Sequence, residues 1–263
     1  YALDANTTAN DNTAVGYASL GANTTGASNT ASGRSALFSN TTGNYNVASG
    51  YQALYYNTGT SNVALGAFAL DANTTASNNT AVGYNSLGAN TTGTQNTALG
   101  AYALDANTTA NQNTAIGYGS LGANNTGGTN TAVGYTSLTA NTDGASNTAV
   151  GWAALVANIG GDYNTALGRS ALAGNTTGTS NIAIGGFALD ANTTSNYSTA
   201  VGYQALGVST GASNTALGRD AGLDVTTGSN LTLIGHNAQP SSATATNEVT
   251  LGDTNVATFR CQV

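Results

Sequence analysis

A motif of about seventeen residues recurs along the whole chain and constrains the fold more than any other feature. Its consensus is N-T-A-[VIL]-G-Y-x-[SA]-L-x-x-N-T-T-G-x-x, anchored by the glycine that follows the aliphatic residue. Successive anchor glycines lie 17 residues apart, except that Gly66 follows Gly50 and Gly218 follows Gly202 after 16. A short fixed period is typical of a solenoid, in which each repeat forms one coil that stacks on the next. The anchor glycines are Gly16, Gly33, Gly50, Gly66, Gly83, Gly100, Gly117, Gly134, Gly151, Gly168, Gly185, Gly202, Gly218, Gly235 and Gly252.

The two shortened repeats separate strand from turn. Both lose their residue between the consensus leucine and the next asparagine, in segments 57–61 and 208–213. A turn tolerates such a loss, whereas a one-residue slip inside a strand would move every following side chain to the opposite face. We therefore expect T-A-V to form the strand and N-T-T-G the turn. The predicted fold is all-β: a parallel β-solenoid, or β-roll, with coils of about 17 residues.

The predicted strands carry small residues on one face and larger ones on the other. Side chains alternate along a strand, so Ala81 faces one way while Thr80 and Val82 face the other. Stacked coils would turn these positions into an alanine row and an aliphatic row. Each coil also supplies a leucine four residues after its glycine, such as Leu87. An interior lined by alanine and leucine is narrow, which suits a thin coil.

Helical and disordered structures explain the repeat less well. Alanine and leucine favour helices, but each glycine in a helix costs about 1 kcal/mol relative to alanine, and every repeat contains glycine. A disordered linker would not restrict the position before the anchor glycine to valine, isoleucine or leucine in nearly every copy. This substitution pattern is that of a packed strand.

A single coil buries only one face of its strand and leaves the aliphatic row as an apolar stripe. Coils stacked at a strand spacing of about 4.8 Å over the whole repeat predict a rod of about 70 Å. A stripe of that length exceeds what monomeric proteins usually expose. We expect three rods to bury it around a common axis as a homotrimer, because strands that are apolar on both faces are typically covered on both. Ser32 and Ser49 interrupt the row and predict a wetter stretch of that axis.

Composition excludes several classes of partner. Four basic residues against eleven acidic ones leave a net charge of -7, which removes the electrostatic basis for binding nucleic acid or an anionic membrane. The longest apolar stretch, residues 152–157, is far shorter than the ~20 residues that a membrane-spanning helix needs. The single cysteine, Cys261, excludes an intrachain disulfide and a cysteine-based zinc cluster. We expect an isolated thiol there, and pairing between chains stays open.

We divide the chain after residue 235. Residues 1–235 are predicted to form a β-solenoid repeat array, and residues 236–263 an atypical terminal coil and a C-terminal tail that leads to a downstream region. Residues 1–6 match residues 102–107, so the chain starts inside a coil, without an initiator methionine or a targeting segment. We therefore expect it to be part of a longer protein.

The strand motif resembles repeats of known fibrous proteins. N-T-A-V-G followed by a short outer segment is similar to the head repeats of trimeric autotransporter adhesins, whose parallel β-rolls trimerise through N-S-V-A-I-G strands. The longer coil with its N-T-T-G segment more closely resembles repeats of phage tail-fibre-like proteins. Residues 247–263 are similar to the stretch that precedes a self-cleaving intramolecular chaperone in such fibres. The resemblance implies an extracellular fibre on a virion or cell surface, with loss of a chaperone after Val263 as a hypothesis.

No constellation of residues for catalysis is recognisable. The single histidine, His236, occupies a slot that tyrosine fills elsewhere, and no G-x-S-x-G elbow accompanies it. Four aspartates recur at one turn position, which indicates turn capping rather than a glycosidase acid pair. The G-G-x-G-x-D array of calcium-binding repeats is missing. We predict a protein that is not an enzyme and has no metal site and no cofactor. The four aspartates are Asp4, Asp71, Asp105 and Asp190.

A mixed aromatic and cationic stripe follows the anchor glycines. Its aromatic members are Tyr17, Tyr51, Tyr84, Tyr118, Tyr135, Trp152 and Tyr203, and Arg34, Arg169 and Arg219 take the same position in other coils. We expect these side chains to pack at coil edges or between subunits, and stacking on sugar rings of a host surface stays open. The candidate carbohydrate contacts are Tyr84, Tyr118, Tyr135 and Trp152.

Two asparagines recur in each coil. The one four residues before the glycine, as in Asn79 and Asn96, is expected to stack amide on amide along the axis. The other begins N-T-T and satisfies N-x-[ST], the acceptor pattern for N-linked glycans. Turn chemistry alone explains this motif, but exposed turns would also accept a glycan. The candidate attachment sites are Asn23, Asn40, Asn73, Asn90, Asn107, Asn175 and Asn192.

The leading functional hypothesis is structural and adhesive. It describes an extracellular trimeric fibre or stalk that gains reach coil by coil and presents a surface to host carbohydrate or protein. One alternative is a monomeric solenoid that binds ice or ordered water through the threonine row from Thr13 to Thr215. A second is a polysaccharide-binding or depolymerising protein of the tailspike kind, which needs paired carboxylates in a groove between strands.

Overall fold

The computed structural model describes residues 1–256, which fall into two compact units, 1–146 and 147–256. The predicted β-solenoid is confirmed, because the T-A-V segments form three-residue strands. These strands recur about every 17 residues and are joined by turns. In the first unit the strands are β1 (Thr13–Val15), β2 (Thr30–Ser32), β3 (Val47–Ser49), β4 (Val63–Leu65), β5 (Thr80–Val82), β6 (Thr97–Leu99), β7 (Thr114–Ile116) and β8 (Thr131–Val133). In the second unit they are β9 (Thr148–Val150), β10 (Thr165–Leu167), β11 (Ile182–Ile184), β12 (Thr199–Val201), β13 (Thr215–Leu217), β14 (Thr232–Ile234) and β15 (Val249–Leu251).

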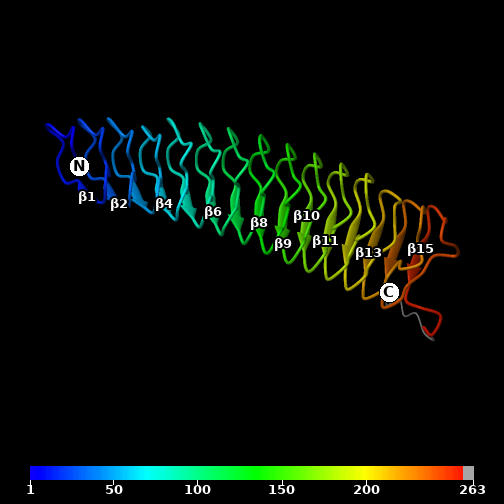
Figure 1. The fold of residues 1–263 in the computed structure, drawn as a ribbon. Helices are drawn as coiled ribbons and strands as arrows, with labels where there is room; N and C mark the ends of the chain where they lie inside the picture. The colour runs from blue at the N-terminus through cyan, green and yellow to red at the C-terminus, as the bar shows by residue number, and fades with distance from the viewer. Residues whose placement is uncertain (257–263) are drawn as a thin grey trace, which may run out of the picture. The chain divides into compact units, whose positions relative to one another are not determined.

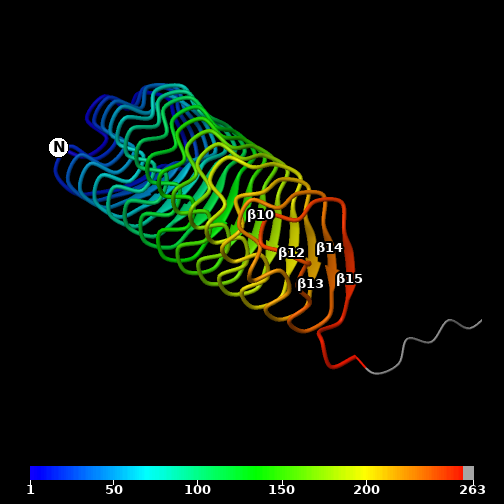
Figure 2. The ribbon, with the colours of Figure 1, turned by 90° about the vertical axis from the view of Figure 1, so that its right-hand side faces the viewer.

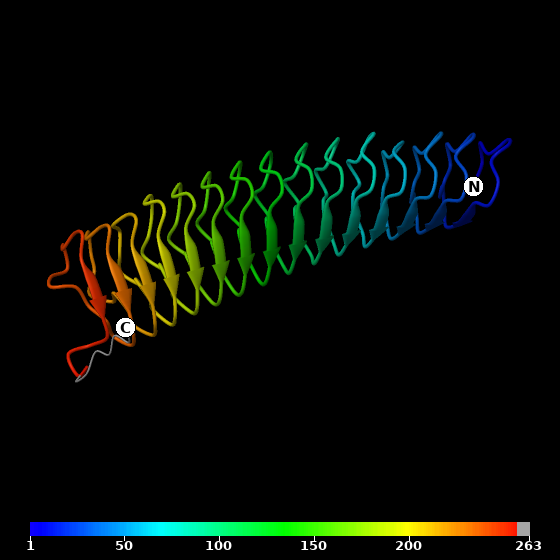
Figure 3. The ribbon, with the colours of Figure 1, turned by 180° about the vertical axis from the view of Figure 1, so that it is seen from behind.

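Within each unit, neighbouring strands pair in parallel and in register. Ala81 of β5 lies opposite Ala98 of β6, so equal positions of the repeat meet. Figures 1 and 3 show the strands of each unit in chain order along one side of their coils, with the turns on the other side. The two shortened coils leave this register intact, since Val47 pairs with Val63 and Thr199 pairs with Thr215. The missing residues therefore fall in turns, as predicted.

The core of each unit contains the strand alanine and the leucine that follows the anchor glycine by four residues. Ala98 and Leu104 have no exposed surface. Figure 2 shows the coils of the second unit stacked one on the next, so the leucine positions of successive coils follow one another along the core. Full burial of one such side chain contributes roughly 1.5–3 kcal/mol. The fully buried leucines are Leu20, Leu37, Leu54, Leu70, Leu87, Leu104, Leu121, Leu138, Leu155, Leu172, Leu189 and Leu206.

The core leucines have a left-handed backbone conformation that the sequence pattern does not reveal. Leu104 has a φ of 51° and Leu121 a φ of 50°. This conformation costs a non-glycine residue roughly 1–2 kcal/mol, so burial of the leucine side chain must outweigh the strain. The left-handed leucine bends the chain within a short turn and directs its side chain into the core.

The asparagines of N-T-T form a buried ladder along each unit. Asn90 Nδ2 donates to Asn73 Oδ1 at 3.0 Å and to the Gly93 carbonyl at 3.0 Å. Asn107 Nδ2 in turn donates to Asn90 Oδ1 at 2.9 Å. Each amide thus satisfies the coil before it, the coil after it and its own turn. Amide-to-amide stacking was predicted for the other asparagine of the repeat, so the assignment of the ladder was wrong.

The asparagine before each strand bonds mainly to backbone groups. Asn79 Oδ1 accepts the Asn96 backbone N–H at 2.9 Å, and Asn96 Nδ2 donates to the Ala110 carbonyl at 2.8 Å. An exception is Asn181 Nδ2, which also lies 3.3 Å from Asn164 Oδ1. These side chains are buried and structural, as predicted, but they close the coil by bonding across to the turn rather than by stacking alone.

The N-T-T ladder ends at Asn192 in the second unit. Ser209 takes the asparagine's place in the next coil, and Val225 takes it in the following one. Asn192 Oδ1 is buried and is one of two buried side-chain oxygens without a hydrogen-bond partner in the part of the chain that the structure describes. Such an oxygen destabilises a fold by about 1–3 kcal/mol.

Substitution of an anchor glycine is expected to destabilise the solenoid. Gly100 has a φ of 139°, and a Cβ there would lie 2.5 Å from the Gly117 carbonyl oxygen. We expect Gly100→Ala to lower the free energy of unfolding by at least about 2 kcal/mol, measured by denaturant titration. Gly119→Asn is the control, because its φ of 60° suits asparagine and the nearest atoms are 3.9 Å from a Cβ. Similar losses in both variants would contradict this explanation.

The asparagine ladder predicts stability changes of opposite sign. Asn90→Ala leaves unpaired groups on Asn73 and Asn107, and we expect it to cost roughly 1–3 kcal/mol. Ser209→Asn supplies a donor to Asn192 Oδ1 and should raise the melting temperature. The other shortened coil already accommodates asparagine at the same place, as Asn57. Thermal unfolding of both variants checks the pair, and a more stable Asn90→Ala protein would refute the ladder's role.

Candidate functional site

The outward face of the strands carries a threonine row beside an aliphatic row. In β6, Thr97 and Leu99 both point outward, and Leu99 is 45% exposed. Ser32 and Ser49 interrupt the aliphatic row in β2 and β3. The predicted apolar stripe is therefore confirmed within each unit. Its most exposed members are Val15, Leu65, Leu99 and Ile116 in the first unit and Leu167, Ile184, Leu217, Ile234 and Leu251 in the second.

A stack of rings and guanidinium groups forms a second continuous surface. In most coils one such side chain joins the stack, and neighbouring ring centroids lie between 5.2 and 6.0 Å apart. Most neighbouring rings meet edge to face, whereas Tyr118 and Tyr135 are nearly parallel at 13°. The order is Tyr17, Arg34, Tyr51, Phe68, Tyr84, Tyr102, Tyr118 and Tyr135 in the first unit and Trp152, Arg169, Phe187 and Tyr203 in the second.

Three rings of this stack were missed by the sequence pattern. Phe68, Tyr102 and Phe187 follow their anchor glycines by two residues instead of one. In each of those coils a small residue, alanine or glycine, directly follows the anchor glycine. The ring therefore moves by one residue while its place in the stack stays filled. The sequence does contain this signal: where the residue directly after the anchor glycine is small, the next residue is aromatic.

Two of the three arginines predicted in the stripe, Arg34 and Arg169, lie between rings, whereas Arg219 Nε lies 3.1 Å from Asp220 Oδ2. The Arg34 guanidinium lies 5.9 Å from the Tyr17 centroid and 5.8 Å from the Tyr51 centroid. Arg169 lies 5.1 Å from the Trp152 centroid. Cation–π contacts of this kind contribute about 0.5–1 kcal/mol at exposed sites. Both charges thus stabilise the packing along the stack.

The candidate carbohydrate contacts are members of this stack. Their side chains are about half exposed, but neighbouring rings cover part of each ring face. The predicted packing at coil edges is confirmed for the tyrosines, and contact with sugars stays a prediction. These residues are Tyr84, Tyr118, Tyr135 and Trp152.

The asparagines proposed as glycan attachment sites are buried, so the expectation that they are exposed is wrong. Their side chains have no accessible surface, and their Nδ2 atoms are hydrogen-bonded inside the ladder. A glycan is linked through this same nitrogen, and the folded coil leaves no room for it. The threonines of the turns remain on the surface. The buried asparagines are Asn23, Asn40, Asn73, Asn90, Asn107, Asn175 and Asn192.

Three recurring aspartates are partly buried at a turn. Burial raises the pKa of Asp71, Asp105 and Asp190 above the usual value. At Asp71 and Asp105, hydrogen bonds from the backbone, including that of Ala72 to Asp71, oppose this effect on the pKa and fit a turn-capping role. Asp105 lies beside the glycines of the neighbouring coils, and a Cβ on Gly122 would be 3.5 Å from Asp105 Oδ1.

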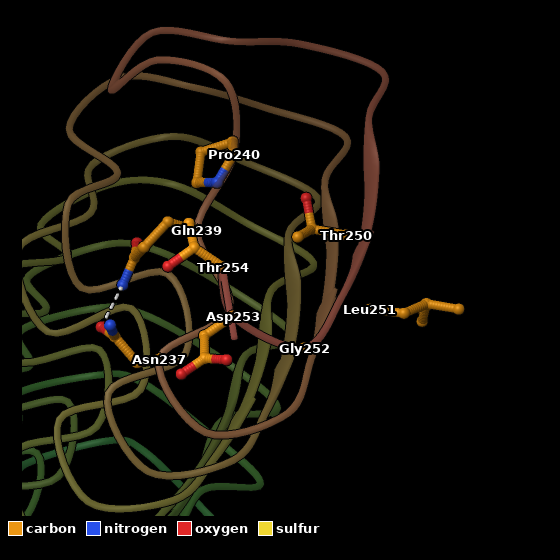
Figure 4. Close-up of a pocket in the computed structure, with 8 residues that line it drawn as sticks. All are labelled: Asn237, Gln239, Pro240, Thr250, Leu251, Gly252, Asp253 and Thr254. Atoms are coloured by element: carbon orange, nitrogen blue, oxygen red, sulfur yellow. Dashed lines mark hydrogen bonds between the residues drawn. The ribbon is translucent and has the colours of Figure 1, made fainter. Parts of the chain in front are cut away.

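A pocket of about 310 Å³ lies at the last coil of the second unit. Figure 4 shows the side chains of Asn237, Gln239, Asp253 and Thr254 around a common space, while Leu251 points away from it. His236, which the sequence assigned a structural or surface role, is exposed beside this pocket. The lining residues are Asn237, Gln239, Pro240, Thr250, Leu251, Gly252, Asp253 and Thr254.

Residues 1–256 contain no group of three or more histidine, cysteine, aspartate or glutamate side chains placed to hold a metal ion. No helix in the same range is long and apolar enough to cross a membrane. Cys261 and Val263 lie outside the described residues, and the predicted boundary after residue 235 stays a prediction.

Comparison with known proteins finds no match. No protein-family model, curated protein or solved structure corresponds to this chain.

Neutralising the partly buried aspartates is expected to stabilise the protein at neutral pH. Their folded pKa lies above the unfolded value, so the folded state favours the protonated form and stability falls as pH rises through this interval. A D71N, D105N and D190N triple variant should melt at a higher temperature than the parent at pH 7, and the gain should shrink toward pH 4. The control is Asp224→Asn, at an exposed aspartate. A gain that is independent of pH would contradict this mechanism.

Proposed function

We propose that this chain is an extended element of an extracellular fibre that self-associates as a homotrimer through the outward face of its strands. The observation that carries the proposal is the exposed aliphatic row, which recurs coil after coil in both units. In a single chain, every added coil would expose more apolar surface to water. Association of copies through it supplies a favourable hydrophobic contribution that grows with the number of coils.

The chemistry of this face supports association between identical chains. The outward positions of β1 to β15 hold threonine, serine, valine, leucine or isoleucine, and none is charged. Charged residues are depleted from the cores of protein interfaces. An uncharged row can face its own copy without like-charge repulsion, which a fibre of identical chains requires.

The fibre proposal also accounts for the interior of the coil. Alanine, leucine and hydrogen-bonded asparagine fill the core of each unit almost completely, and repetition of one coil extends the structure at constant width. The ring stack on the second surface supports an adhesive role, since half-exposed aromatic rings are suited to contact with sugar or protein. The proposed location is the surface of a virion or cell.

A monomeric protein that binds ice or ordered water is the second candidate. The exposed threonine row, with Thr97 as an example, favours it, because in-register strands space these hydroxyl and methyl groups regularly. This function needs the same face to be open to water. The oligomeric state therefore separates the two candidates.

Charge on the strand face should break the assembly. We expect the native protein to have the mass of a trimer in light scattering and a Leu99→Glu, Ile116→Glu double variant to have a smaller mass. Three copies would place six carboxylates in an apolar contact. Circular dichroism checks that the variant keeps its fold. The control is Thr109→Glu with Thr126→Glu, two exposed turn positions in neighbouring coils, and it should stay trimeric.

A monomeric native protein would overturn the fibre proposal. If that monomer also showed thermal hysteresis of freezing, the ice-binding function would replace it.

A further inference from the structure

The last described coil of the second unit departs from the repeat at its core. Gln239 stands four residues after Gly235, where coils up to that of Leu206 have leucine and the coil between them has Gly222. Thr250 occupies the middle of β15, where most strands have a buried alanine. Two apolar core positions are thus polar at the place where the pocket opens. The polar side chains of this coil therefore face a space that the consensus coil fills with alanine and leucine.

Gln239 is held rigidly by three hydrogen bonds. Its Nε2 donates to the Asp220 carbonyl at 3.0 Å and to Asn237 Oδ1 at 3.1 Å, while its Oε1 accepts the Asp224 backbone N–H at 3.1 Å. Because Asn237 Oδ1 is occupied, the orientation of the Asn237 amide is set. Its Nδ2 is then the amide group left to donate, and Asn237 lines the pocket.

Asp253 supplies an acceptor to the same pocket. Its carboxylate accepts the backbone N–H of Asn255 at 2.9 Å and the Asn255 Nδ2 at 3.1 Å. These hydrogen bonds lower the pKa of Asp253, and the charge of His236 adds to the effect. Each carboxylate oxygen retains a further lone pair. The pocket therefore presents a fixed amide donor beside an ionised acceptor.

The lining indicates the class of ligand. Neighbouring hydroxyl groups on a pyranose ring both donate and accept, so they match an amide donor next to a carboxylate. The hydroxyls of Thr250 and Thr254 add further polar groups, and the ring of Pro240 provides an apolar wall for sugar C–H groups. The volume of about 310 Å³ is at the small end of ligand pockets. Asp253 and a chain charge of -7 disfavour an anionic ligand.

We propose that this pocket binds one pyranose unit of a neutral carbohydrate, with Asn237 as donor and Asp253 as acceptor. The inference deepens the proposed fibre function and rests on it, because a sugar site on the fibre gives adhesion a defined position. It differs from the aromatic stack in its residues and in its chemistry. The competing explanation is a polar cap that only shields the end of an apolar core.

Saturation-transfer NMR with the methyl glycosides of glucose, galactose, mannose and N-acetylglucosamine tests the proposal. We expect at least one of the four to bind the native protein, and Asp253→Asn and Asn237→Ala each to weaken binding at least tenfold. Gln239→Leu removes the hydrogen bond that orients Asn237, so it too should weaken binding. Asp143→Asn, an exposed change of equal charge away from the pocket, should leave binding unchanged.

Two results would overturn the sugar site: no binding of any of the four glycosides, or binding that survives both Asp253→Asn and Asn237→Ala. Melting temperatures of the variants separate lost contacts from lost structure. Light scattering on the same samples gives the oligomeric state. A trimer without binding refutes the sugar site alone, whereas a monomer that binds refutes the fibre alone.

Discussion

Each coil within a unit lies on a near copy of itself, and the other features of the structure depend on this registry. Backbone hydrogen bonds such as that from Thr97 N to the Asn113 carbonyl, at 2.8 Å, hold neighbouring coils at the spacing of β-strands. At that spacing every side chain meets its own counterpart. Asparagine suits this arrangement because its amide both donates and accepts, and alanine, threonine and aromatic rings also stack well. A row of like charges would repel itself, which explains why only 6% of the residues are charged.

The charged residues that do occur are placed where registry does no harm. Arg34 lies between two tyrosine rings instead of against another arginine. Asp105 has glycine in the same position of both neighbouring coils, Gly88 and Gly122. Each charge thus has uncharged neighbours along its row. The cost of partial burial remains, and it appears as the raised pKa of Asp105.

Registry also separates two kinds of surface. Positions that repeat, such as the aliphatic row and the ring stack, form long stripes within each unit, broken in the aliphatic row only by Ser32 and Ser49. Positions that depart from the repeat form local features. Gln239 and Thr250, at positions where most coils have leucine and alanine, line the polar pocket of the last described coil. The proposed assembly surface therefore consists of repeated positions, and the proposed sugar site of positions that depart from the repeat.

The sequence by itself determined the coil length, the position of each strand, the buried alanine and leucine and the outward aliphatic row. These follow from the period and from side-chain alternation, which are local rules. The tertiary structure alone decided that the N-T-T asparagines point inward, that rings from two sequence positions share one stack, and that the core leucines are left-handed. Each of these depends on the path of the backbone through the turn. A repeat pattern shows where a turn begins and ends, but the direction of its side chains is set only when neighbouring coils compete for the same hydrogen bonds and the same interior space.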